Sequence, residues 1–389
     1  MHIAVTVEGA DSGMSGLSTY IRELYQVLVR HPDISRVTVF GPHDMTSWLG
    51  GLTKGHAQVV FVPTPSNMTT RSANVIWHQT SWALQLARKY KPDVVHFPVA
   101  NRRIAYIPGI PTVGTVHDLA ELRGLRGYGV LRNLYLRRVV VPMFALLNQT
   151  IFISKKTAAD LSDVTRLSTR KHSIIYQGID HRRFFPGDKE QARAQVAQEF
   201  SLTDPFVFFP SRLEHPTKNH LRLFEAFMTV RKRLGNRHRL VLSGALWPGA
   251  EPILSAIENY TPAVIYLGHV SQNWLPALYA AAECMVFPSL YEGFGLPLLE
   301  AMACGTPVVT STGGALQEIA GDAAVVFDPT NVQEMENQLF TILSNPDWAA
   351  TITQRGLSHA AGFTWESTAE QTLRCFHAAK TSKKGWKPQ

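Results

Sequence analysis

The chain has 389 residues, of which 45% are hydrophobic and 17% are charged, with a net charge of +8. This length suggests two domains, each large enough for its own core. The positive charge suits phosphorylated ligands, anionic lipid or nucleic acid, but no zinc-finger, RNP-like or helix-turn-helix pattern occurs, which disfavours nucleic acid. Three cysteines without metal-type or disulfide-framework spacing, and an opening MHIAVTVEGA without signal-peptide features, indicate a globular protein of the cytoplasm.

Apolar runs alternate with helical patterns along the chain, which is typical of parallel sheets covered by helices on both faces. In the first half, strands are predicted at His2–Val7, Arg36–Phe40, Gln58–Val62, Asp93–Phe97, Thr112–His117, Thr150–Ser154 and Ser173–Tyr176. Helices are predicted there at Leu17–Arg30, Asn74–Tyr90, Val130–Leu147 and Lys155–Leu161. A second set of strands is predicted at Phe206–Ser211, Leu240–Gly244, Val264–Gly268, Cys284–Pro288, Pro307–Ser311 and Ala324–Phe327. The polar stretch Gln177–Asp204 separates the two halves.

Residues 284–311, CMVFPSLYEGFGLPLLEAMACGTPVVTS, form the most informative segment. A buried strand leads through a short loop into a helix that begins at Leu296-Pro297 and stops at Gly305. The N–H groups at such a helix start can bind phosphate, and two carboxylates, Glu292 and Glu300, bracket this start. Phosphate and carboxylates repel each other. A single ligand that offers both diphosphate and hydroxyl groups, such as a sugar nucleotide, therefore fits the segment best.

The motif E-G-F-G-L-P-x-x-E-A-M-A-x-G-x-P-V-V in this segment resembles the signature of the retaining family 4 glycosyltransferases. Fold maintenance alone would explain Gly305 and Pro307, but it explains Glu292 and Phe294 poorly. The resemblance covers nearly the whole chain and implies an α/β fold of GT-B architecture, with two Rossmann-like doubly wound domains facing each other across a cleft. We expect an acceptor-side domain at 1–185 and a nucleotide-sugar domain at 186–364, with the C-terminal helix, about 365–389, packing back on the first domain.

The segment PSRLEHPTKNH places Arg212 and Lys218 after a strand and beside a helix start. Arginine binds oxygen pairs and lysine adds a point charge, so together they can clamp a diphosphate and stabilise the charge that grows on the leaving group. The family carries a similar pair, usually after a glycine, where this chain has Ser211. The alternative is two solvated surface charges.

Two further loops follow strands of the first half. Gly13 and Gly16 precede a helix, where the backbone could approach a ligand closely, although their spacing is not a dinucleotide fingerprint and a simple tight turn is the alternative. The resemblance implies that donor and acceptor meet at this loop. It also implies that His117 bonds the sugar or the acceptor, whereas Asp118 orients the loop; a purely structural histidine is the alternative. The absence of a G-x-S-x-G elbow argues against a hydrolase.

The remaining roles come from the resemblance. Glu292 would bond sugar hydroxyls and Glu300 the ribose hydroxyls, while backbone groups near His269 and Val270 would hold the nucleobase. The catalytic residues would be Glu292, His117, Arg212 and Lys218. The donor-binding residues would further include Gly293, Phe294, Gly295 and Leu296.

The expected reaction moves a hexosyl unit, with mannose favoured, from a nucleotide diphosphate sugar to a hydroxyl of a glycan or lipid-linked acceptor, with retention of configuration. No carboxylate stands out as a glycosyl nucleophile, and no D-x-D triplet or metal cluster occurs, so we expect no metal and no cofactor. GDP-mannose is the favoured donor, with UDP- and dTDP-sugars as alternatives. A non-catalytic or epimerase-type nucleotide-sugar-binding protein of the same fold is the rival hypothesis.

An arginine-rich stretch, residues 121–144, bears on the acceptor. Its five arginines among aromatic and aliphatic residues suit a helix lying on an anionic membrane surface, or equally a helix with one solvated basic face: Arg123, Arg126, Arg132, Arg137 and Arg138. Contact with the inner face of the cytoplasmic membrane would suit a lipid-linked acceptor of surface-polysaccharide assembly.

Overall fold

The computed structural model describes residues 1–10, 16–42, 52, 55, 57–65, 76–122, 134–165 and 171–382. The chain divides into two units, one formed by Met1–Gly178 with Trp365–Gln389 and the other by Ile179–Thr364. The division at Gly178 lies inside the predicted linker Gln177–Asp204, a few residues before the expected boundary at 185. The cause is a backbone pairing, since Ile179 bridges to Thr364 and its N–H donates to the carbonyl of Phe363 at 3.2 Å.

The first unit is built on a parallel sheet of seven strands within the described residues, in the order β3-β2-β1-β4-β5-β6-β7. Its strands are β1 (His2–Thr6), β2 (Arg36–Gly41), β3 (Gln58–Pro63), β4 (Val94–Phe97), β5 (Thr112–Val116), β6 (Gln149–Phe152) and β7 (His172–Ile174). The strand order reverses between β1 and β4. In open sheets of this kind, ligands bind outside the carboxyl ends of the strands at such a switch point.

Helices of the first unit include two stretches that differ from expectation. The stretch predicted as one α-helix up to Tyr90 is mainly π-helical, and the helix predicted to reach Leu147 ends at Phe144, because a hydrophobic period distinguishes neither π from α nor the last turn. The elements are α1 (Gly16–Leu28), η2 (His78–Trp82), α4 (Ala83–Gln85), η3 (Leu86–Tyr90), η4 (Leu136–Val140), α6 (Val141–Phe144), α7 (Lys155–Thr165) and α16 (Trp365–Thr381).

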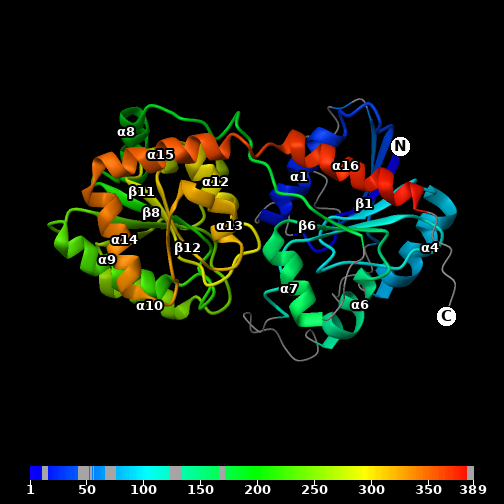
Figure 1. Ribbon diagram of the computed structural model, residues 1–389, viewed down its shortest axis with the longest axis horizontal. Coiled ribbons are helices and arrows are strands. Elements are labelled where there is room, and N and C mark those ends of the chain that lie inside the picture. Colours follow the sequence, from blue (N-terminus) through cyan, green and yellow to red (C-terminus); the bar gives the residue numbers. More distant parts are fainter. Residues whose placement is uncertain are drawn as a thin grey trace. The chain divides into compact units, whose positions relative to one another are not determined.

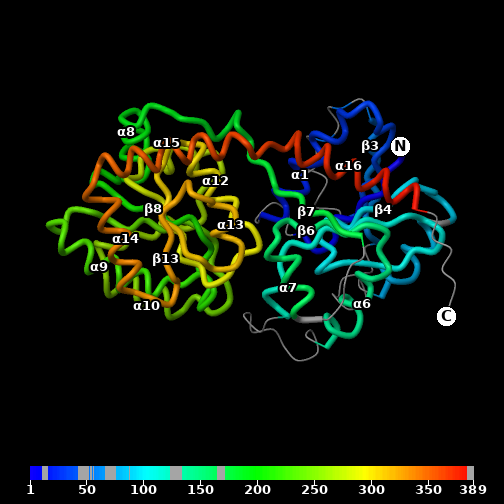
Figure 2. Tube along the Cα trace, in the orientation of Figure 1, coloured from blue at the N-terminus to red at the C-terminus, as the bar shows by residue number. Residues whose placement is uncertain are grey.

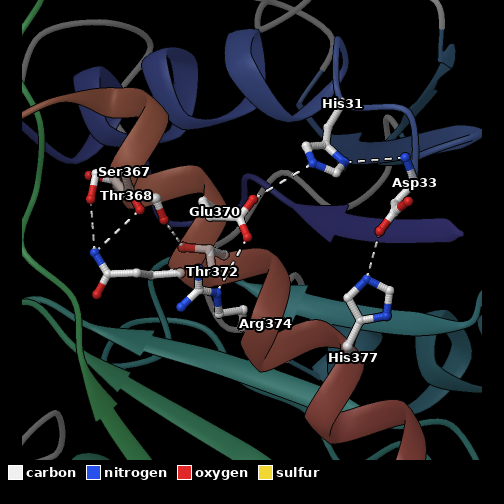
Figure 3. A network of polar contacts seen from close by, with 9 residues as sticks. His31, Asp33, Ser367, Thr368, Glu370, Thr372, Arg374 and His377 are labelled. Atoms are coloured by element: carbon white, nitrogen blue, oxygen red, sulfur yellow. Dashed lines mark hydrogen bonds and ion pairs between the residues drawn. The ribbon is translucent and has the colours of Figure 1, made fainter.

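The C-terminal helix α16 completes the first unit, and Figure 2 follows the chain back to that unit in red. One stripe of α16 is buried against α1 and strands β4 to β6, as expected for an amphipathic helix. Its exposed side carries a polar network in which Glu370 lies 3.7 Å from His31 and His377 lies 3.1 Å from Asp33 (Figure 3). These exposed pairs add little stability beside the buried stripe.

The second unit has a parallel sheet of six strands within the described residues, in the order β10-β9-β8-β11-β12-β13. Its strands are β8 (Phe206–Pro210), β9 (Arg239–Ser243), β10 (Val264–Tyr266), β11 (Cys284–Phe287), β12 (Val308–Ser311) and β13 (Val325–Phe327). Here the order reverses between β8 and β11, so the loops after these two strands meet at the switch point.

Helices cover both faces of the second sheet, with α8, α12 and α15 along one side of the strands and α9 and α10 along the other (Figure 1). The elements are α8 (Lys189–Phe200), α9 (His220–Arg233), α10 (Glu251–Tyr260), η5 (Gln272–Trp274), α11 (Leu275–Ala281), α12 (Leu296–Ala303), α13 (Leu316–Ala320), η6 (Gly321–Ala323), α14 (Val332–Ser344) and α15 (Pro346–Ala360). None of the described helices combines the length and the apolar composition that crossing a bilayer requires. The expectation of two doubly wound α/β domains is confirmed.

Candidate active site

The switch point of the second sheet brings together residues that are 74 positions apart in the chain. Lys218 follows β8, Glu292 follows β11, and the ammonium of Lys218 donates to Oε1 of Glu292 at 2.5 Å. The pair is largely buried, since the two side chains are 10% and 15% exposed. The predicted diphosphate cation therefore contacts the predicted sugar-binding carboxylate and offsets its negative charge.

Arg212, the second predicted cation, is held on two sides. Its Nε donates to Oε2 of Glu214 at 2.7 Å, and its guanidinium carbon lies 4.3 Å from the ring centre of Trp247. Trp247 is in the loop after β9, and neither it nor Glu214 was singled out from the sequence. Both cations are thus ordered at the carboxyl end of β8, whereas the alternative required two solvated charges.

Close backbone contacts hold the loop that carries Glu292 in place. Gly314, with φ of +67°, forms a parallel bridge to Glu292, and a Cβ at this glycine would lie 2.2 Å from the carbonyl oxygen of Glu292. A Cβ at Gly313 would lie 2.1 Å from the carbonyl oxygen of Ser289. Only glycines fit at both positions. Sequence reasoning missed this pair, although two consecutive glycines, one residue after a predicted strand, were an available signal.

Asn219 ties the neighbouring loops together from the start of α9. Its side-chain amide donates to the carbonyls of Pro288 at 3.0 Å and Pro329 at 2.8 Å. Its φ of +62° is left-handed, a conformation that asparagine tolerates better than most residues. Asn219, the residue after Lys218, therefore connects the loops after β8, β11 and β13.

Glu300, the second predicted carboxylate, lies on α12 and accepts a hydrogen bond from the hydroxyl of Tyr279 at 2.9 Å. Burial raises the pKa of Glu300, and the Tyr279 bond and the charge of Arg183 oppose this rise. Burial also raises the pKa of Tyr279 well above its usual value, so its phenol stays protonated and can only donate to the carboxylate. Tyr279 is a further residue that the sequence analysis did not identify.

The predicted phosphate contact lies at the start of α12. Gly295 is its N-cap residue with φ of +104°, and no side chain caps the helix. The predicted contacts Gly293, Phe294, Gly295 and Leu296 are all buried beside Glu292. Tyr291 is buried too, so the aromatic side chains on both sides of Glu292 pack inward and its carboxylate alone turns to Lys218.

The predicted nucleobase contacts follow β10. His269 is exposed and Val270 is buried. Gly268, with φ of +72°, accepts at its carbonyl from the N–H of Gly244 at 2.8 Å. The loop after β10 is thereby joined to the loop after β9, which carries Trp247.

In the first unit, His117 lies at the carboxyl end of β5. Its Nε2 is 2.8 Å from the carbonyl of Pro98, which can only accept, so Nε2 carries the proton. Burial lowers the pKa of His117 to about 4, which leaves the ring neutral at pH 7 with Nδ1 as an acceptor. Asp118 accepts from the N–H of Ala120 at 3.3 Å and shapes the turn. Gly16 is the first residue of α1, whereas Gly13 lies outside the described residues.

Besides His117, the described part of the chain contains three buried histidines, which are His78, His96 and His220. Burial lowers the pKa of each of these three to about 3. None of these four is placed to hold a metal, and across the described residues no group of three or more His, Cys, Asp or Glu has an arrangement for one.

Comparison with known families accounts for both halves of the chain. Residues 14–183 match the family model described as Glycosyltransferase Family 4, and residues 190–359 match the model described as Glycosyl transferases group 1. Among curated proteins, the chain is similar to O-antigen chain mannosyltransferase B of Escherichia coli, with 39% identity over 46% of this chain and 48% of that protein. Serotype-specific mannosyltransferase WbdA of Escherichia coli is 28% identical over 77% of this chain and 39% of its own length. The chain thus spans less than half of these two relatives.

Among solved structures, Alr3699/HepE of Anabaena in complex with UDP-glucose superimposes with a TM-score of 0.76 and 19% identity, over 97% of this chain and 100% of that one. This likeness shows the GT-B fold. The two family models, which match residues 14–183 and 190–359, show that the chain belongs to the glycosyltransferases that combine a family 4 N-terminal domain with a group 1 C-terminal domain.

Proposed function

We propose that the protein transfers a hexosyl unit from a nucleotide diphosphate sugar to a hydroxyl of a glycan or lipid-linked acceptor, with retention of configuration. The observation that carries this proposal is the Lys218–Glu292 pair at the switch point of the second sheet. It puts a cation for phosphate and a carboxylate for hydroxyls side by side. The names of the two mannosyltransferase relatives favour mannose as the sugar. GDP-mannose is the donor that we favour, and UDP- and dTDP-sugars are the alternatives.

The division of labour follows from which oxygen atoms the protein already uses. Within the described residues, Lys218 takes Oε1 of Glu292 and Tyr279 takes Oε2 of Glu300, so each carboxylate keeps one oxygen without a partner. We assign the free oxygen of Glu292 to sugar hydroxyls and that of Glu300 to the ribose hydroxyls. Hydrogen bonds from hydroxyls to carboxylates are charge-assisted and therefore strong.

Arg212 and Lys218 would bind the diphosphate, assisted by the uncapped start of α12. Their positive charge would stabilise the phosphate as the bond from the sugar C1 to the phosphate oxygen breaks. The acceptor oxygen would form the new bond to C1 on the same face, and its proton would pass to the departing phosphate oxygen. This step uses no carboxylate nucleophile and calls for no metal.

His117 would form a hydrogen bond to the sugar or the acceptor. As a neutral ring with the proton on Nε2, it can accept a hydroxyl hydrogen bond at Nδ1 without adding positive charge.

A cytoplasmic location at the inner membrane face is also proposed. Its support is the described part of the arginine-rich stretch, where Leu134 and Val139 are exposed beside Arg137 and Arg138; Arg123, Arg126 and Arg132 lie outside the described residues.

The test is a donor screen with GDP-, UDP-, dTDP- and ADP-sugars, read by melting temperature and by release of the nucleotide. We expect one nucleotide class to raise the melting temperature and to be released slowly, and Glu292→Ala to lose both effects. Failure of every donor to bind would refute the proposal. Sedimentation with anionic and neutral vesicles tests the membrane part, which equal binding to both or to neither would refute.

A further inference from the structure

Arg212 is immobilised in a way that leaves its terminal nitrogens available. Glu214 takes Nε at 2.7 Å, and the ring of Trp247 covers one face of the guanidinium at 4.3 Å. Within the described part of the chain, Nη1 and Nη2 have no hydrogen-bond partner. The side chain of Arg212 is 22% exposed, whereas that of Glu214 is 5% exposed, so the end of the guanidinium extends outward from a buried carboxylate.

Trp247 is itself fixed by backbone pairing to the loop that carries Arg212. Leu213 bridges to Leu246, the N–H of Leu213 donates to Ala245 at 3.0 Å, and the N–H of Trp247 donates back to Leu213 at 3.2 Å. The approach depends on Gly244, because a Cβ there would lie 2.3 Å from the carbonyl oxygen of Ser211. The indole is therefore held to the arginine by the fold.

The same short turn also positions the other cation. The carbonyl of Glu214 accepts from the N–H of Lys218 at 3.1 Å, so the residue that holds Arg212 by its side chain holds Lys218 by its backbone. Glu214 thereby links the two cations that the proposed function assigns to the diphosphate.

We propose that Trp247, together with Glu214, is a positioning residue that presents Nη1 and Nη2 of Arg212 to the diphosphate of the donor. The inference rests on the proposed function. An arginine has many rotamers, and ordering it costs entropy on binding. A guanidinium that is stacked and tethered in advance avoids this cost and offers two parallel N–H donors to a phosphate.

The experiment measures binding of GDP and UDP by calorimetry to the whole chain. For whichever of the two nucleotides the wild type binds, we expect Trp247→Leu to weaken the affinity about 2- to 30-fold, the range of a cation–π contact. The affinity of Trp247→Phe should lie between those of the wild type and Trp247→Leu. Trp348→Leu is the matched control, because Trp348 also has an arginine over its ring, Arg355 at 5.7 Å, on α15. We expect this control to bind like the wild type.

A double-mutant cycle separates positioning from a general structural role. In an Arg212→Met background, Trp247→Leu should change nucleotide affinity by less than about twofold, because its effect passes through the arginine. Full additivity of the two changes, or unchanged binding by Trp247→Leu, would overturn the proposal while leaving the proposed function intact. Absence of binding by the wild type and the Trp348→Leu control would instead refute the proposed function.

Discussion

Replacing Lys218 with methionine separates the two roles that the structure gives this lysine. The change leaves the Glu292 carboxylate, 15% exposed, without its cation. An exposed ion pair contributes about 0–1 kcal/mol, whereas removing one partner of a buried pair costs about 3–5 kcal/mol. For this mostly buried pair we expect a loss of about 2 kcal/mol, or about 4–8 °C in melting temperature for a unit of this size.

Nucleotide binding should fall further than stability. A charge-assisted hydrogen bond contributes about 1.5–3 kcal/mol, so Lys218→Met should weaken binding of the nucleotide diphosphate about 10- to 150-fold. The double variant with Glu292→Gln should recover most of the stability, because no unpaired charge remains, but none of the affinity. Lys189→Met, which breaks a more exposed pair with Glu283 at 3.4 Å, is the control and should change neither quantity much.

Denaturant unfolding measures the stability, and calorimetry measures the nucleotide affinity, of the wild type, Lys218→Met, the double variant and Lys189→Met. The reasoning is refuted if the double variant regains wild-type affinity, since Lys218 would then only neutralise Glu292. Binding by Lys218→Met within twofold of the wild type would have the same meaning.

Three further outcomes are expected. Tyr279→Phe removes a hydrogen bond that opposes the raised pKa of Glu300, so the pH below which nucleotide affinity is lost should move upward; an unchanged pH profile of the dissociation constant would contradict this. Gly314→Ala should lose nucleotide binding and stability together, because its Cβ would lie 2.2 Å from a backbone oxygen, whereas Gly305→Ala, with φ of +75° and no atom closer than 4.0 Å, should lose about 1 kcal/mol of stability and keep binding. The four buried histidines stay neutral in the folded protein at pH values where the unfolded chain takes up protons. The free energy of unfolding should therefore fall as the pH drops from about 6.5 towards 4, by up to about 1.4 kcal/mol per pH unit for each histidine, and a melting temperature that is constant over this range would show that they are not buried as neutral rings.

The strands could be predicted from the sequence because each buried parallel strand is a short apolar run bounded by turn residues. The strand–loop–helix around Glu292 is local as well, so its order along the chain was readable. The π-helical stretch η2–η3 was not, because its hydrophobic spacing over a few turns resembles that of an α-helix. The two units divide just before the polar, turn-like HRRFFPGDKEQ, because Ile179 pairs with Thr364, a partner far along the chain that no local pattern indicates.

The candidate site shows the same division between local and distant effects. The residue types of Arg212, Lys218 and Glu292 pointed to a diphosphate and to hydroxyls. The contact between Lys218 and Glu292 depends on the strand order, which places β8 beside β11. Likewise, Trp247, whose ring stacks on Arg212, comes from the loop after the neighbouring strand β9, and a tryptophan in a loop carries no local signal of such a role.

The most direct test of the central claim is transfer of radiolabelled mannose from GDP-mannose to a mannose-terminated glycan, with the product linkage read by NMR and Glu292→Ala as the comparison. The account predicts a labelled product whose new linkage keeps the anomeric configuration of the donor, and no product with the variant. If GDP-mannose yields none, the same assay with the UDP- and dTDP-sugars completes the test. A product of inverted configuration, equal activity of Glu292→Ala, or no transfer from any of these donors would contradict it.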